Sequence, residues 1–147
     1  MHDGDREAAA DRPDAVFREA ARRVSELRHG PYSDLATVEA AGLLAESVRY
    51  LNHAAARDGM SDPAAAAAVL AYVCSAVYRF PRLFGLLGDW AAAEAAAGRL
   101  ADDDGCPGWQ LAESARSVLR TATEDADALA RCLGAAHSLT STFHGAG

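Results

Sequence analysis

The sequence contains no lysine and no isoleucine, and it has only one asparagine. Leu, Ile, Val and Phe together make up 27 of its 147 residues, about 18%. Because β-branched residues are scarce, the composition excludes a β-sandwich or a thick α/β domain. So low a content of Leu, Ile, Val and Phe also raises the question of disorder, but disordered chains usually carry a high net charge. The formal net charge here is only −7, so the composition favours a thin-cored folded protein.

Several signatures of particular protein classes are also missing. All 14 cations are arginines and they form no basic stripe, so direct nucleic-acid binding is not expected. The three cysteines lack CxxC spacing, and the acidic N-terminus lacks the apolar segment of a signal peptide. The longest uncharged run, residues 63–78, has 16 residues, fewer than the roughly 20 that a membrane span needs. We therefore expect a cytoplasmic protein that does not bind membranes.

The sequence is instead rich in alanine, which accounts for 36 of the 147 residues and is the best helix former. Apolar residues recur at spacings of three and four, which predicts four helices that begin near residues 13, 34, 63 and 109. The turns between them are short, so the predicted fold is all-α, an antiparallel four-helix bundle with Ala-rich heptad seams. We expect residues 1–12 to be a disordered arm and 13–144 to form one helical-bundle domain.

The ends of the predicted helices carry recognisable signals. Ser33 and Asp62 are good N-cap residues, and Pro63 suits the first position of a helix. Pro81, however, lies inside the third predicted helix, where a proline costs about 3 kcal/mol. The apolar spacing continues from Val69 to Trp90 without a slip. This favours a kink over a complete break near Pro81.

No motif indicates catalysis or metal binding. The acidic turn at residues 102–105 fails the calcium-loop pattern, because Cys and Pro stand where oxygen ligands and glycine are required. His137 and His144 are about 10 Å apart along a helix, too far to share a metal ion. Nucleophile-elbow, phosphate-loop and di-iron patterns are absent from the sequence. We expect no catalytic residues, no metal and no cofactor. An enzyme is the third and least favoured hypothesis, after an interaction protein and a ligand-binding bundle.

One polar position lies beside the seam of the second predicted helix. Asn52 is expected opposite Tyr72 if the second and third helices pack antiparallel. It could fix the register of the bundle through a buried hydrogen bond, or it could simply face water. A third possibility is a small ligand pocket between these helices, with Arg49, Tyr50, Asn52 and Tyr72 as the candidate binding residues.

Aromatic residues concentrate on the third predicted helix, and more of them occur there than one seam can bury. A second copy of the chain or another protein would cover the excess. The candidate interface residues are Tyr78, Phe80, Pro81, Phe84 and Trp90.

Two stretches, RYLNHA at residues 49–54 and YRFPRLF at 78–84 followed by Trp90, resemble a group of small uncharacterised actinobacterial helical proteins. The resemblance covers about residues 35–140. Phe80, Arg82 and Phe84 depart from the group, which has Leu, Gln and Leu there. The resemblance implies a helical fold and an actinobacterial source, and it carries no activity. It also implies roles beyond packing for Arg49, Asn52, Arg79 and Pro81.

Together these features predict a non-enzymatic helical-bundle protein with an interaction or accessory role. We expect it to self-associate as a homodimer or to dock onto another protein through the aromatic face of the third helix. The alternative is a regulatory bundle that binds a small molecule between helices two and three.

Overall fold

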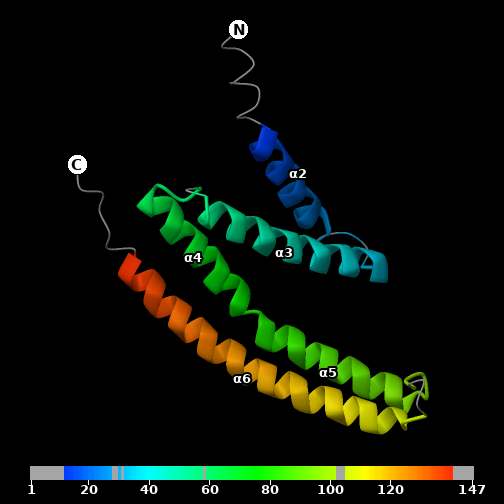
Figure 1. Ribbon diagram of the computed structural model, residues 1–147. Coiled ribbons are helices and arrows are strands. Elements are labelled where there is room, and N and C mark those ends of the chain that lie inside the picture. Colours follow the sequence, from blue (N-terminus) through cyan, green and yellow to red (C-terminus); the bar gives the residue numbers. More distant parts are fainter. Residues whose placement is uncertain (1–11, 28–29, 31, 58, 102–104, 141–147) are drawn as a thin grey trace. The chain divides into compact units, whose positions relative to one another are not determined.

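The computed structural model describes residues 12–27, 30, 32–57, 59–101 and 105–140 (Figure 1). These residues form helices and contain no strand, so the all-α prediction is confirmed. The helices are α2 (Arg12–Leu27), α3 (Asp34–Ala55), α4 (Pro63–Val77), α5 (Phe80–Ala96) and α6 (Gly108–Thr140). Residues 1–11 of the predicted N-terminal arm, the acidic residues 102–104, His29 and His144 lie outside the described residues. Arg12, the last residue of the predicted arm, begins α2.

The chain divides into two compact units, Met1–Gly59 and Met60–Gly147. The first unit contains α2 and α3, and the second contains α4, α5 and α6. A single antiparallel four-helix bundle formed by both units stays a prediction.

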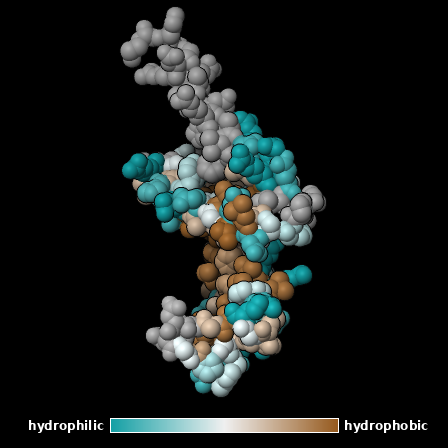
Figure 2. All heavy atoms as spheres, turned by 90° about the vertical axis from the view of Figure 1, so that its right-hand side faces the viewer, coloured by the Kyte–Doolittle hydropathy of each residue, from teal (hydrophilic) through white to brown (hydrophobic). Residues whose placement is uncertain are grey.

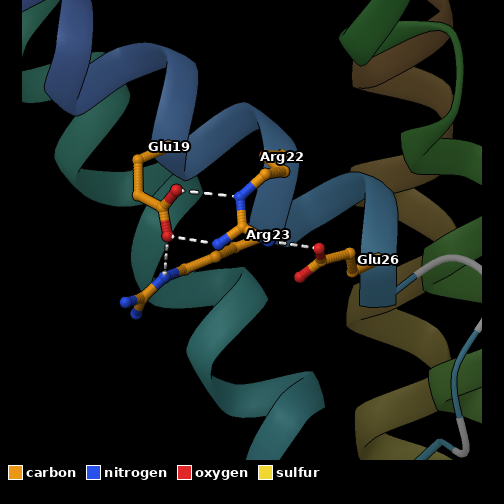
Figure 3. A network of polar contacts seen from close by, with 4 residues as sticks. All are labelled: Glu19, Arg22, Arg23 and Glu26. Atoms are coloured by element: carbon orange, nitrogen blue, oxygen red, sulfur yellow. Dashed lines mark hydrogen bonds and ion pairs between the residues drawn. The ribbon is translucent and has the colours of Figure 1, made fainter.

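Hydrogen bonds and charges shape the helices of the first unit. Ser33 caps α3 as predicted, since its Oγ accepts a hydrogen bond from the backbone N–H of Ala36 at 3.2 Å. On α2, Glu19 pairs with Arg22 at 2.6 Å and with Arg23 at 3.0 Å, and Arg22 also pairs with Glu26 (Figure 3). The hydrogen bonds from Arg22 and Arg23 lower the pKa of Glu19 to about 2. They favour the ionised carboxylate on the surface of this helix.

The second unit is an antiparallel helical hairpin in which α6 lies along both α4 and α5 (Figure 1). Arg116 on α6 pairs with Asp89 on α5 at 3.4 Å, and Cys74 on α4 contacts the carbonyl oxygen of Ala130 at 3.8 Å. From the first contact to the second, the residue number falls by 15 along α5 and α4 and rises by 14 along α6. One antiparallel register therefore holds along the whole hairpin.

The third predicted helix is interrupted at Tyr78 and Arg79, where α4 ends and α5 begins. Pro81 has no N–H for the carbonyl of Val77, and its ring crowds that carbonyl, so the regular hydrogen-bond ladder cannot continue. The backbone N–H of Arg79 bonds instead to Ala76 at 3.0 Å. The Arg79 guanidinium donates to the carbonyl oxygen of Ser75 at 2.7 Å. Both interrupting residues keep right-handed helical angles, so the apolar spacing persists although the helix is divided.

The core of the second unit is small. Its buried apolar residues are one valine and four alanines: Val77, Ala91, Ala112, Ala126 and Ala130. Partly buried side chains pack against the cluster of Val77, Ala126 and Ala130, namely Val73, Phe80, Phe84 and Leu133. No side chain of the described residues is less than 2% exposed. The alanines allow a close approach of the helices, as the composition predicts, but each removes little apolar area from water.

Candidate functional site

An open groove of about 490 Å³ runs between α5 and α6 on one side of the hairpin. From α5 it is lined by Pro81, Phe84, Gly85, Gly88 and Asp89. From α6 it is lined by Glu113, Arg116, Ser117, Leu119, Arg120 and Thr123. All of these residues belong to the second unit, so the groove is complete within it.

Two glycines on α5 create the hollow. A Cβ at Gly88 would lie 3.4 Å from Cγ of Arg116, so a larger residue there would press on α6. A Cβ at Gly85 would meet nothing within 4 Å, so this position opens directly onto the groove. Each glycine costs a helix about 1 kcal/mol relative to alanine. Because the two glycines have no side chains, they leave space on the α5 side of the groove, and they reduce the intrinsic stability of the helix.

The charges of the groove are ordered along its length. Asp89 and Arg116 pair across the groove at 3.4 Å, and both side chains are more than half exposed. Glu113 and Arg120 lie on either side of this pair on α6. Their separation of seven positions corresponds to about 10.5 Å along the helix axis. Among the described residues neither makes an ion pair, so the groove presents one acidic end and one basic end.

The basic end of the groove is also its apolar end. Pro81 and Phe84 line it from α5, and both are half-buried. The ring of Phe84 lies 5.7 Å from that of Phe80, a tilted aromatic contact that fixes the wall. In the antiparallel register of the hairpin, Pro81 lies at the level of Thr123, about one turn beyond Arg120.

Large apolar side chains are also left exposed outside the groove. On α5, Leu83, Leu86 and Trp90 follow helical spacing along one face and are 46%, 58% and 59% exposed. We call these three residues the outer face of α5. At the start of α6, Trp109 is 65% exposed. Figure 2 shows hydrophobic surface left open on the side of the molecule in view.

The five predicted interface residues do not share one exposed face. Tyr78 and Trp90 are exposed, at 63% and 59%. Phe80 and Phe84 instead pack against the buried cluster of Val77 and its alanine neighbours. The spacing of these aromatic residues in the sequence does not say which of them face α6 and which face away from it.

Sequence reasoning missed the α6 side of the groove, including Glu113, Arg116 and Arg120. The available signal was the pair of glycines, Gly85 and Gly88, three residues apart in a helix otherwise rich in large side chains. That spacing leaves a gap on one helical face, but it does not say which residues of another helix border the gap.

The predicted ligand residues lie in different units. Arg49, Tyr50 and Asn52 belong to α3, and Tyr72 belongs to α4. Arg49 pairs with Glu46 of the same helix at 3.6 Å. The pocket between helices two and three therefore stays a prediction.

Metal and membrane features are limited in the described part of the chain. Within it, no group of three or more His, Cys, Asp or Glu side chains could hold a metal ion. Nδ1 of His137 is buried and has no hydrogen-bond partner among the same residues. The stretch Pro63–Ala96 contains a segment with a mean hydropathy of 1.4, long and apolar enough by length and composition alone to cross a membrane.

Comparisons with known proteins give no relative from which to transfer a role. No family model, no curated protein and no solved structure matches the chain.

Proposed function

We propose that this protein is a non-enzymatic helical interaction protein that acts as a cytoplasmic homodimer. The observation that carries the proposal is the contrast within the second unit. Its buried core consists of one valine and four alanines, whereas the outer face of α5 and Trp109 remain exposed. A hairpin is a single layer of helices, and a stable domain normally buries its apolar residues between two layers. A partner surface would supply the second layer.

The exposed residues also have the composition of a contact surface. Tryptophan and arginine are enriched at protein interfaces, and a fully buried leucine contributes about 1.5–3 kcal/mol. Leu83, Leu86 and Trp90 together offer a large apolar area on one helix face. Arg116 and Arg120 border the groove between α5 and α6. Covering such a surface favours association of the folded chains.

A protein partner fits this surface better than a lipid bilayer does. The most apolar helix, α4, has 15 residues, which corresponds to about 22 Å at 1.5 Å per residue. The hydrocarbon core of a bilayer is about 30 Å thick. A span of about 20 residues that starts at Pro63 would end at Arg82 and would bring Arg79 and Arg82 into the hydrocarbon region, where each charge is costly.

Size-exclusion chromatography with light scattering tests the proposal on the full chain. We expect a mass near twice the 15.4 kDa of one chain, approached as the concentration rises from micromolar to millimolar. A monomer across this whole range would contradict the proposal. Flotation with vesicles of phosphatidylcholine and phosphatidylglycerol provides the second measurement. The protein should stay with the soluble fraction, and flotation with the vesicles would favour a membrane role instead.

A further inference from the structure

We propose that the groove between α5 and α6 is the homodimer interface, occupied by α6 of a second copy of this chain. The inference rests on the self-association proposed above and assigns it to one surface. In this arrangement the two α6 helices run antiparallel about a two-fold axis near Arg116 and Ser117. Glu113 of each chain meets Arg120 of the other, and Trp109 of each chain enters the apolar end of the other groove.

The first argument is charge complementarity. Glu113 and Arg120 bear opposite charges and make no ion pair among the described residues of their own chain. Their midpoint on α6 falls between Arg116 and Ser117. A two-fold axis at that midpoint exchanges the acidic end of one groove with the basic end of the other. A C2 interface must be complementary to itself, and Glu113 and Arg120 satisfy that condition. The two Arg116 side chains that meet near the axis are each paired with Asp89 of their own chain.

The second argument is the position of Trp109. It belongs to the same face of α6 as Glu113, Arg116 and Arg120, since these four residues follow a 4-3-4 spacing. The same two-fold axis brings Trp109 of the second copy to the level of residues 123 and 124. Thr123 is a groove residue and lies at the level of Pro81, beside Phe84. A 65% exposed indole thus meets the apolar end of the groove.

The third argument is the available space. Gly85 has nothing within 4 Å of its Cβ position, and Ser117 on the opposite wall is also small. Small residues on both walls let the axis of an incoming helix come close to the groove. This arrangement covers Trp109, one of the exposed apolar side chains that support the homodimer, and leaves the outer face of α5 open, so the two surfaces can be tested separately.

Charge exchange provides the decisive experiment, with the dimer dissociation constant of the full chain as the readout. Glu113→Arg sets arginine against arginine at two symmetry-related positions, so the dissociation constant should rise by at least about tenfold. Arg120→Glu should weaken the dimer in the same way. The double variant Glu113→Arg with Arg120→Glu restores opposite charges, and it should recover most of the wild-type affinity. Failure of the double variant to recover affinity would overturn the inference.

A steric variant provides an independent test. Gly85→Leu should remove the dimer without unfolding the chain, because the structure has room for the side chain only while the groove is empty. Gly42→Leu is the matched control, since Gly42 lies in α3 and also has nothing within 4 Å of its Cβ position. Circular dichroism should show no loss of helix in either variant. A dimer that persists in Gly85→Leu would overturn the groove assignment.

The outcomes separate the two proposals. A wild-type monomer would overturn both the proposed function and the groove interface. A wild-type dimer that tolerates Glu113→Arg and Gly85→Leu would keep the homodimer and overturn only its assignment to this groove. In that case Leu86→Asp on the outer face of α5 should dissociate it.

Discussion

Val77 provides the sharpest test of the core described for the second unit. It is 5% exposed and is the largest of the buried side chains at the contact between α4 and α6. Val77→Ala removes two methyl groups from this contact. At about 0.8 kcal/mol per buried methylene the loss is about 1.6 kcal/mol, and any unfilled cavity adds to it. The better helix propensity of alanine returns a few tenths of a kcal/mol, so we expect a net loss of about 1–2 kcal/mol.

Val118→Ala is the matched control because it makes the same chemical change on α6 at a side chain that is 69% exposed. It gains the same helix propensity and loses little burial, so its effect should stay within about 0.5 kcal/mol. Urea unfolding followed by circular dichroism measures both variants at one protein concentration. The midpoint should fall clearly for Val77→Ala and barely change for Val118→Ala. Equal shifts would refute the assignment of Val77 to the core.

Four further predictions concern individual residues. Arg22 and Arg23 lower the pKa of Glu19 from 4.5 to about 2, so the ionised carboxylate stabilises the folded state at pH values above 4.5, and this contribution is lost as the pH falls toward 2. NMR titration of the Glu19 carboxyl should show that its pKa rises when salt is added or when Arg22 is replaced by alanine. Asp62 caps α4 by accepting a backbone hydrogen bond at 2.9 Å, so Asp62→Ala should cost about 1 kcal/mol in urea unfolding, whereas Asp62→Ser should cost little. Pro81→Ala should restore a continuous hydrogen-bond ladder between α4 and α5, and amide hydrogen exchange across the interruption should slow; unchanged exchange would mean that another feature divides the helix. If a small ligand binds near Asn52, a thermal-shift screen of metabolites should find one whose effect disappears in Asn52→Ala, and a screen without any shift would count against that pocket.

The fold class and most helix ends could be predicted from local chemistry. Ser33 and Asp62 cap their helices in the structure because a side-chain oxygen can satisfy an open N–H within two or three residues. Such contacts need no knowledge of the rest of the chain. The alanine content likewise predicts helices that approach closely, and the alanines at 91, 112, 126 and 130 are buried.

The interruption near Pro81 shows where local reasoning becomes ambiguous. An unbroken apolar spacing is compatible with one kinked helix or with two segments, because Tyr78 and Arg79 keep helical backbone angles in either case. The sequence therefore identified the region of the irregularity. The sequence does not show which hydrogen bonds are lost there. Nor does it show that the Arg79 side chain donates to the carbonyl of Ser75, because this depends on side-chain geometry.

The groove was beyond sequence reasoning for a different reason. It depends on the contact of Asp89 with Arg116, which are 27 residues apart on different helices. The spacing within one helix says which residues share a face, but it does not set the register against a second helix. One residue of slip between α5 and α6 would change which charges border Gly85 and Gly88.

The small alanine core also affects how stability depends on temperature. Unfolding raises the heat capacity mainly by exposing apolar surface, typically by about 12–15 cal/mol/K per residue. A hairpin whose buried apolar residues are one valine and four alanines has little such surface to expose. Its heat-capacity change per residue should fall below that range, and its stability curve should be unusually flat. Such a protein would lose little stability on cooling, and calorimetry would show a broad transition with a shallow slope of enthalpy against temperature.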